Sequence, residues 1–397
     1  MNSIRKIAIV VSHPIQHFCP QYGNLAENNK FILKVFFASQ LGLKKYIDVN
    51  FNQEISWSNL KLELFDHEFL NGEAVIQSDK NIDAVSLDKS LCFYKPDIIF
   101  IYGYFQKLQR RAFKWARNNK IRIAYISDSE LRQKRPWWNL FLKYFYLRRF
   151  FKYVDYFLTV GEANEFYYQW LGVPKEKFLR MHFPIDINSY HSGWIQRKEF
   201  RDIIRKEYNI PDCDLILTVV GKLVSWKNQD HIILALRKLE NEGIFLQLFI
   251  IGSGEMRQEW EKKCTTLKRS QVHFTGFVKI EELPKYYAAT DIYVHPASIE
   301  PHSIAISEAI YMGCPVIISN RCGSYGTDDD VQVMRNGFVY NFGDIDELCI
   351  QIKKLVLDFE LRERFGFISH QLAVRYQEKA HYGILDELFI NLNEKKP

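Results

Sequence analysis

The sequence lacks the features that mark membrane-spanning, secreted and repetitive proteins. No segment approaches the roughly 18 consecutive apolar residues that a membrane-spanning helix needs. The apolar run near the N-terminus is too short for a signal peptide, and a histidine and a proline follow it at once. There is neither an internal repeat nor a low-complexity tract. We therefore expect a cytoplasmic protein.

Disulfide and metal-binding patterns are also missing. None of the 7 cysteines belongs to a C-x-x-C pair, which favours reduced thiols. No group of histidines and cysteines has the spacing of a zinc site. The sequence DCD at 212–214 precedes an expected strand, so we assign it to a turn, and we assign DDD at 328–330 to a solvated loop. The sequence therefore predicts no metal and no cofactor.

A strong excess of one charge is absent as well. The chain has 53 Lys and Arg residues against 47 Asp and Glu residues, a formal net charge of +6. This mild balance does not indicate a general nucleic-acid-binding protein. The chain is instead rich in hydrophobic residues, which make up 47% of it. With 397 residues, it is long enough for two or three domains with full-sized cores.

Short apolar segments alternate with helical segments twice along the chain. The first set of expected strands is IRKIAIVVS, DIIFIYG, IRIAYIS and YFLTVG, and the second is LILTVVGKL, LQLFIIGSG, VHFTGF, IYVHPA and PVIIS. This alternation predicts parallel sheets that helices cover on both faces. The fold class is therefore α/β, with two Rossmann-like domains that face each other across a cleft.

The two sets of strands divide the chain. The segment FPIDINSYHSGWIQRKEF has a proline, a glycine and no clear period, so we interpret it as an irregular linker. We expect one Rossmann-like domain over 1–185, the linker over 186–211 and a second Rossmann-like domain over 212–370. A helix over 371–397 is expected to pack back on the first domain. Ligands of such sheets bind beyond the carboxyl ends of the strands, which here places a ligand in the cleft.

Lysines, glycines and a carboxylate follow the strands of the second set. They are Lys222, Lys227, Gly252, Gly276 and Glu300. A helix follows Glu300, and Ser303 is a suitable N-cap for it. Two lysines, close backbone approach at glycines and a free helix N-terminus together form a site for a diphosphate.

Glu308 lies in an otherwise apolar helix that we expect from Ser303 to Met312, with Gly313 ending it. A carboxylate is rarely buried without a partner. Either a cationic side chain pairs with Glu308, or Glu308 hydrogen-bonds a molecule that the chain does not contain. Because a diphosphate site is expected nearby, we infer that Glu308 and Glu300 bind the hydroxyl groups of a nucleotide-linked ligand.

Several motifs resemble one family in order and spacing. Glu300 and Glu308 form E-x7-E, which is followed by A-x-x-x-G-x-P-V-I. Before and after it stand GKL, IIGSGE, FTGF, YYAATDIYVHPA and NGFVYNFGDIDEL. Together they resemble the retaining glycosyltransferases of family four (glycosyl transferases group 1), which have the GT-B fold. The likeness covers roughly residues 215–350 and is much weaker before the linker.

The resemblance implies a role for each matching residue. The diphosphate of the donor would be held by Gly221, Lys222, Lys227 and Gly252, and its distal phosphate would face the amides of Ser303 and Ile304. Glu300 would contact the transferred sugar, and Glu308 would bind the ribose hydroxyls. Gly276 and Phe277 would lie against the base. Lys222, Lys227 and Glu300 would be the catalytic residues.

The chain departs from the family pattern at several positions. The family usually has arginine where Lys222 stands and glycine where Asn228 stands. Its frequent Gly-Phe-Gly after the first glutamate is Pro301-His302-Ser303 here. The N-terminal half has SHPIQHFCP in place of the usual double-glycine loop.

Four residues of the N-terminal half are candidates for contacts in the cleft. They are His13, Gln16 and His17 in SHPIQHFCP, and Asp128 at the end of IRIAYIS. Asp128 stands where the family often has a histidine, so it is expected to orient an acceptor hydroxyl. The alternatives are that one of the histidines caps a helix and that Asp128 caps the helix after it.

The resemblance implies a metal-independent transferase that moves a sugar from a UDP- or GDP-sugar to a hydroxyl acceptor with retention of configuration. The first domain would bind the acceptor and the second the nucleotide sugar. The acceptor would be a glycan or a lipid-linked precursor in polysaccharide biosynthesis. Two alternatives remain open. One is a sugar-nucleotide epimerase or hydrolase on the same fold, and the other is a non-catalytic, membrane-associated protein that binds nucleotide sugars.

The segment 132–152, RQKRPWWNLFLKYFYLRRFFK, has seven basic residues, many aromatic residues and no acid. Basic and aromatic side chains that alternate in this way suit a helix on an anionic membrane surface. This reading predicts a peripheral protein on the inner face of the cytoplasmic membrane, where many members of the family glycosylate lipid-linked acceptors. Apolar residues fall on several faces of the segment, so a core helix with basic ends is the alternative.

Overall fold

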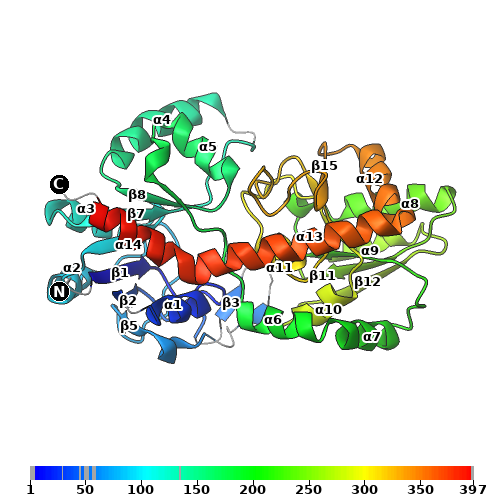
Figure 1. Ribbon diagram of the computed structural model, residues 1–397, viewed down its shortest axis with the longest axis horizontal. Coiled ribbons are helices and arrows are strands. Elements are labelled where there is room, and N and C mark those ends of the chain that lie inside the picture. The colour runs from blue at the N-terminus through cyan, green and yellow to red at the C-terminus, as the bar shows by residue number, and fades with distance from the viewer. Residues whose placement is uncertain are drawn as a thin grey trace.

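The computed structural model of the chain describes residues 5–28, 30–43, 46–48, 53–55, 60–133 and 136–394. Two lobes lie side by side, and a long helix near the C-terminus runs from one to the other (Figure 1). Each lobe is built on one parallel β-sheet with helices around it. The predicted fold class, α/β with two Rossmann-like domains, is confirmed.

The N-terminal domain has a sheet of seven parallel strands in the order β5–β2–β1–β6–β7–β8–β9. The strands are β1 Arg5–Val11, β2 Phe31–Phe37, β5 Asp66–Phe69, β6 Ile98–Tyr102, β7 Arg122–Ile126, β8 Tyr156–Thr159 and β9 Phe178–Arg180. A separate antiparallel pair is formed by β3 Tyr46–Asp48 and β4 Gln53–Ile55. The strand residues alternate between two buried clusters, with Ile7 and Ile9 in one and Ala8 and Val10 in the other. Both faces of the sheet are therefore covered, as parallel sheets require.

Helices from both ends of the chain cover this first sheet. One face packs on α1 Cys19–Ala26 and on α14 Ile384–Glu394. The other face packs on α2 Leu87–Tyr94, α3 Lys107–Asn118, α4 Trp137–Phe151 and α5 Glu162–Trp170. The short 3-10 turns are η1 Leu62–Leu64 and η2 Lys175–Lys177.

The C-terminal domain has a sheet of six parallel strands in the order β12–β11–β10–β13–β14–β15. The strands are β10 Ile216–Val220, β11 Gln247–Ile251, β12 Gln271–Gly276, β13 Ile292–His295, β14 Val316–Ser319 and β15 Gly337–Tyr340. The helices are α8 Asp230–Asn241, α9 Arg257–Cys264, α10 Leu283–Ala289, α11 Ile304–Tyr311, α12 Ile345–Leu357 and α13 Phe359–Glu378, with a 3-10 turn, η3 Ser225–Lys227. Ser303 occupies the N-cap position of α11, and Gly313 follows its end with φ of +72°, as predicted.

The prediction of an irregular linker between the domains is wrong. Residues 186–211 contain two helices, α6 Ile187–Ile195 and α7 Arg197–Glu207. Asp186 caps α6, because its carboxylate accepts hydrogen bonds from the amide and the hydroxyl of Ser189. Gly193 lies within α6 because a Cβ there would stand 2.7 Å from Pro284 of α10. The glycine that suggested irregular chain is thus a packing requirement.

The connection between α13 and α14 joins the two domains a second time. A π-helical turn, η4 Lys379–Gly383, lies between the two helices. Gln377 pairs with the backbone of Phe183 and Ile185 at 2.8 and 2.9 Å, and His381 bonds Ile185 O at 2.9 Å. The chain between the domains and the returning helix are therefore held together side by side.

Most apolar side chains of α4 face solvent. Six of them are more than half exposed: Trp137, Trp138, Phe141, Leu142, Phe145 and Tyr146. Only Leu147 and Phe151 of this helix are buried. The reading of 132–152 as a core helix therefore holds only for its C-terminal part, where Leu147 and Phe151 join the core. Lys134 and Arg135 lie outside the described residues. Over the described ranges, no helix combines the length and the apolar character needed to cross a membrane.

Candidate functional site

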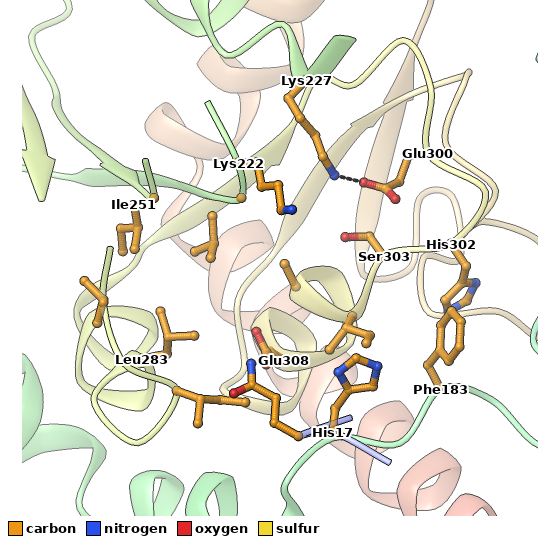
Figure 2. Close-up of a pocket in the computed structure, with 18 of the residues that line it drawn as sticks. His17, Phe183, Lys222, Lys227, Ile251, Leu283, Glu300, His302, Ser303 and Glu308 are labelled. Atoms are coloured by element: carbon orange, nitrogen blue, oxygen red, sulfur yellow. Dashed lines mark hydrogen bonds and ion pairs between the residues drawn. The ribbon is translucent and has the colours of Figure 1, made fainter. Parts of the chain in front are cut away.

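A cavity of about 580 Å³ lies between the two domains. Its walls come from the ends of β10 and β11, from the loops after β12 and β13, and from the N-terminus of α11. The N-terminal half contributes Gln16, His17, Asp128 and Phe183. Figure 2 shows Lys222, Lys227, Glu300 and Glu308 directed into the same space. Most of the residues that we expected to bind a donor are thus brought together at the carboxyl ends of the strands.

The glycines at this edge are needed for the approach of neighbouring backbones. A Cβ on Gly252 would lie 2.0 Å from the carbonyl oxygen of Gly221, and a Cβ on Gly254 would lie 2.3 Å from that of Leu223. The ends of β10 and β11 can therefore meet, and Gly221, Lys222 and Gly252 all line the cavity. From the sequence we expected these glycines to let the backbone approach a diphosphate. In the structure they first let two segments of the protein's own backbone approach each other.

Lys227 and Glu300 form an ion pair inside the cavity. Their side chains are 18% and 12% exposed, so the pair is mostly shielded from solvent. His295 Nε2 lies 2.9 Å from the same carboxylate oxygen. Burial opposes ionisation of Glu300, but the charge of Lys227 and the hydrogen bond with His295 outweigh it and lower the pKa of Glu300 to about 2. From the sequence, we expected Lys227 and Glu300 to bind different parts of the ligand, and His295 was not among the candidates.

Asn228 explains one departure from the family pattern. It has φ of 49° and ψ of 36°, the left-handed conformation, which glycine and asparagine tolerate better than other residues. Its side-chain oxygen also accepts a hydrogen bond from the amide of Ser298, at 3.2 Å. The loop that carries Lys227 is thereby tied to the loop that carries Glu300.

Glu308 is buried on α11 and has no salt bridge among the described residues. The hydroxyl of Tyr287 donates to its carboxylate at 2.9 Å. Burial raises the pKa of Glu308 to about 7, and the hydrogen bond from Tyr287 offsets only part of this effect. Since Glu308 also lines the cavity, its remaining hydrogen-bonding capacity is directed to whatever the cavity holds.

The N-terminus of α11 opens on the cavity through Ser303, Ile304 and Ala305. Ser303 makes no side-chain capping bond, so its hydroxyl is not used by the helix. Its amide donates to Ser324 Oγ at 3.0 Å, so it already has an acceptor within the protein. Ile304 is the first residue of the helix, where an amide has no intrahelical acceptor. Of the two amides that we expected to face a phosphate, that of Ser303 is therefore already engaged within the protein.

One end of the cavity is apolar. Phe277, Val278, Ile280 and Leu283 line it together with Ile251. This end suits the flat face of a base, as expected for Phe277. Gly276 does not line the cavity, and its carbonyl instead accepts from the amide of Gly252 at 2.9 Å.

The N-terminal candidates divide into two groups. Gln16, His17 and Asp128 line the cavity, whereas His13 does not. His13 is engaged inside its own domain, where Nδ1 lies 2.9 Å from Ser12 Oγ. Burial lowers the pKa of both histidines to about 4, so both are neutral near pH 7. The helix-capping alternatives are wrong, since Phe18 is the N-cap of α1 and Pro136 that of α4.

The prediction of a solvated loop at 328–330 is also wrong, because Asp329 and Asp330 are buried. Asp329 accepts hydrogen bonds from the amide of Glu162 at 3.0 Å and from Arg180 at 2.8 Å, both in the N-terminal domain. Burial raises the pKa of Asp329 to about 6, although the charge of Arg180 opposes this. The loop therefore holds the two domains together beside the cavity.

Several curated relatives match a part of this chain. The sulfoquinovosyl transferase SQD2 of Arabidopsis thaliana is 28% identical over 134 residues, which are 34% of this chain and 26% of the relative. A GDP-mannose-dependent alpha-(1-6)-phosphatidylinositol monomannoside mannosyltransferase of Mycobacterium tuberculosis is 27% identical over 163 residues, 39% of this chain and 41% of the relative. The chain thus spans less than half the length of these two relatives.

The likeness in structure extends over both domains. The crystal structure of HepE from Anabaena in complex with UDP superposes with a TM-score of 0.71 and covers 99% of this chain and 100% of HepE at 16% identity. Two facing Rossmann-like domains with a ligand cavity between them define a GT-B protein, and this chain has that fold. Residues 200–369 match the model of the family described as Glycosyl transferases group 1. We therefore assign the C-terminal domain to that family.

Proposed function

We propose that this protein transfers a sugar from a nucleoside-diphosphate sugar to a hydroxyl group of an acceptor, with retention of configuration and without a metal ion. The observation that carries the proposal is the convergence of two lysines, a helix N-terminus and two carboxylates on one cavity. The apolar end would take the base, Glu308 the ribose, and Lys222, Lys227 and Ile304 the diphosphate. Glu300 would then face the sugar.

The chemistry follows from the charge that develops in the reaction. The bond between sugar C1 and the phosphate oxygen breaks, and the acceptor oxygen forms a new bond to C1. Lys222, Lys227 and the N-terminus of α11 would stabilise the negative charge that grows on the diphosphate. The departing phosphate oxygen would accept the proton of the acceptor hydroxyl. The carboxylate of Glu300 is held by Lys227 and His295, which supports a role in binding rather than in covalent attack.

The donor is best sought first among uridine and guanosine nucleotides, since HepE was solved with UDP and the mycobacterial relative is named as GDP-mannose-dependent. Thermal unfolding of the protein would be followed with UDP, GDP, UDP-glucose and GDP-mannose. A ligand at 100 times its dissociation constant stabilises a protein by about 2.7 kcal/mol, which is measurable. Failure of all four to raise the melting temperature would contradict the proposal.

Two measurements separate this function from its alternatives. Incubation of the bound nucleotide sugar without acceptor should leave the sugar unchanged, whereas an epimerase or hydrolase would convert it. Transfer to a panel of glycan and lipid-linked acceptors should then appear and should survive EDTA, because lysines supply the positive charge. Loss of transfer in EDTA that Mg²⁺ or Mn²⁺ restores would contradict the metal-independent mechanism. Tight nucleotide binding with no turnover would indicate a binding protein.

We also propose that α4 places the protein on an anionic membrane surface. Trp137, Trp138 and Phe141 are exposed on this helix, and Arg148, Arg149 and Lys152 are exposed at its C-terminal end. Exposed aromatic rings next to basic groups suit the boundary between lipid headgroups and acyl chains. Such a position favours an acceptor that is itself attached to a lipid.

A further inference from the structure

His302 is a buried polar residue in the wall of the cavity. It is not among the residues that we expected to contact the donor. Its exposed fraction is 6%, and neither of its ring nitrogens has a partner in hydrogen-bond geometry among the described residues. A buried nitrogen without a partner is costly, so it points to a ligand atom. In Figure 2, His302 and Phe183 lie at one end of the cavity, and Ile251 and Leu283 lie at the other.

The ring of His302 is fixed from two sides. Its Nε2 lies 3.2 Å from Asp330 Oδ2, and Asp330 is only 2% exposed. The same carboxylate oxygen accepts a hydrogen bond from the hydroxyl of Ser307 at 2.6 Å. On the other side, the ring of Phe183 packs edge-on with its centroid 5.0 Å away. The ring is therefore fixed by an ion-pair contact at Nε2 and by Phe183, and Nδ1 has no such contact.

The surroundings of His302 favour a positive charge on it. Burial alone lowers its pKa, but the close contact and charge of Asp330, together with the charges of Asp329 and Asp128, raise the pKa above the ordinary value. Asp128 comes from the N-terminal domain and lines the same cavity. This end of the cavity therefore presents both a hydrogen-bond donor and a carboxylate, a combination that suits hydroxyl groups, which donate and accept.

The order of groups along the cavity identifies which part of the ligand lies at this end. The base end is apolar, Glu308 and the two lysines lie between, and His302 follows Glu300 by only two residues. A donor laid along these groups reaches His302 with its sugar and not with its base or ribose. The neighbouring sequence Pro301-His302-Ser303 is also where the chain departs from the usual Gly-Phe-Gly of the family it resembles.

We propose that His302, held by Asp330, hydrogen-bonds through Nδ1 to a hydroxyl group of the transferred sugar and thereby determines which sugar the protein accepts. The proposal rests on the proposed glycosyltransferase function. Asp330 does not touch the sugar and acts as a positioning residue for His302.

Calorimetric titration tests the proposal with UDP and UDP-glucose, and with GDP and GDP-mannose. For the pair that the wild-type protein binds, His302→Gln and His302→Phe should weaken the nucleotide sugar about tenfold, the value of one hydrogen bond to a charged group. The dissociation constant of the nucleoside diphosphate should change less than twofold, which also shows that the variants are folded. His273→Gln is the matched control, because His273 is half-buried and hydrogen-bonded but outside the cavity.

Each outcome decides one question. Equal weakening of nucleoside diphosphate and nucleotide sugar would assign His302 to the diphosphate and overturn the proposal. Unchanged binding of both ligands would also overturn it. Failure of the wild-type protein to bind any of the four ligands would instead contradict the proposed function itself.

A ligand-side measurement keeps the proposal testable if the variants do not fold. Deoxy analogues of the bound nucleotide sugar should bind the wild-type protein about tenfold more weakly when one particular hydroxyl is missing. Asp330→Asn, which keeps an acceptor for Ser307 but removes the charge beside His302, should reduce that discrimination. If removal of no single sugar hydroxyl weakens binding by about the value of one hydrogen bond, the assignment is overturned.

Discussion

At the scale of single residues, the ion pair between Lys227 and Glu300 links ligand binding to stability. Both side chains are mostly buried, so removal of the lysine leaves a carboxylate without its partner. We expect Lys227→Met to weaken donor binding and turnover together, since the lysine also stabilises the leaving group. We expect it to lower the free energy of unfolding by about 3 kcal/mol at pH 7 as well. Urea denaturation and donor titration measure the two effects.

The stability effect of Lys227→Met should depend on pH. The folded pKa of Glu300, about 2, lies below its ordinary value of 4.5, so its contribution is complete above pH 4.5 and is lost as the pH falls toward 2. The difference from wild type should therefore shrink between pH 5 and pH 3. Lys238→Met is a matched control, because Lys238 pairs with Asp346 in solvent and its loss should change neither stability nor binding. If Lys227→Met lowered stability equally at pH 5 and pH 3, or kept wild-type turnover, the role assigned to Lys227 would be contradicted.

Glu308 should make nucleotide binding depend on pH near neutrality. Its pKa of about 7 means that part of the population is protonated in the free protein, whereas ribose hydroxyls are bound best by the carboxylate. Binding should therefore strengthen as the pH rises from 6 to 8. The ratio of dissociation constants of Glu308→Gln and wild type should grow from about 1 to about 10 over this range, the value of one hydrogen bond to a charged group.

Taking the ratio at each pH removes the titration of the ligand's own phosphate and of other residues, because both proteins share them. Calorimetry in two buffers of different ionisation enthalpy should also show proton release on binding by the wild-type protein near pH 7. A ratio that does not change with pH would mean that Glu308 does not bind the ribose.

At the scale of elements, the meeting of β10 and β11 depends on Gly252. A Cβ there would lie 2.0 Å from Gly221 O, and φ is +139°. We expect Gly252→Ala to cost about 3 kcal/mol or more of stability and to displace the loop that carries Lys222, with loss of nucleotide binding. Gly343→Ala is the matched control, since its φ is +90° but nothing lies within 4 Å of its Cβ. It should cost about 1 kcal/mol and leave binding unchanged. Similar costs for the two variants would contradict the role of backbone approach.

The sequence predicted those elements whose pattern is local. The strands β10 and β11, whose ends line the cavity, and β13, which leads to Glu300, were expected, and so was α11 with Ser303 at its N-cap. The helices α6 and α7 were missed because Pro184 and Gly193 suggested irregular chain, although the contact of Gly193 with α10 requires a small residue. A contact between distant segments leaves no periodic signal in the sequence.

The same limit applies to the site. Lys222, Glu300 and Glu308 were found because each stands at a predictable place relative to a strand or a helix. The contact between Glu300 and His295, and that between His302 and Asp330, were not, since each depends on how loops fold toward one another. Asp329 and Asp330 looked like solvated residues because charge alone does not reveal an arginine from the other domain.

At the scale of the whole molecule, two connections set the cleft between the domains. The helix pair α13 and α14 crosses on one side and is tied to the interdomain chain through Gln377. Arg180 and Asp329 join the domains beside the cavity, and Arg132 adds hydrogen bonds to the carbonyls of Cys322 and Tyr325 at 2.6 and 3.1 Å. The cavity walls from both domains are therefore held at fixed separation in this structure.

The outer face of α4 provides the last prediction, because it concerns where the whole molecule resides. This helix lies on the N-terminal lobe, away from the C-terminal lobe (Figure 1). If it docks on anionic lipid, the protein should cosediment with vesicles of mixed phosphatidylglycerol and phosphatidylcholine and much less with phosphatidylcholine alone. Salt at 1 M should release it, because screening acts over about 3 Å at that concentration.

Charge-matched variants separate docking by α4 from general electrostatic attraction. Arg148, Arg149 and Lys152 are exposed, so their joint replacement by Gln should leave the fold intact and weaken vesicle binding at least tenfold, given about 1 kcal/mol for each basic residue near the surface. The joint replacement of Lys198, Lys206 and Arg364 by Gln removes the same charge from exposed positions on α7 and α13. This control should bind vesicles like the wild type, because these positions lie on the other domain.

The aromatic residues of α4 should contribute a part of vesicle binding that salt does not remove. Replacement of Trp137, Trp138 and Phe141 by Ser should therefore lower binding at every salt concentration, since it removes apolar area from the lipid boundary. Equal weakening by the α4 and the control charge variants would mean that net charge alone attracts the protein. Negligible binding of the wild type to both kinds of vesicle would leave α4 without a role at the membrane and would favour an acceptor that is not attached to a lipid.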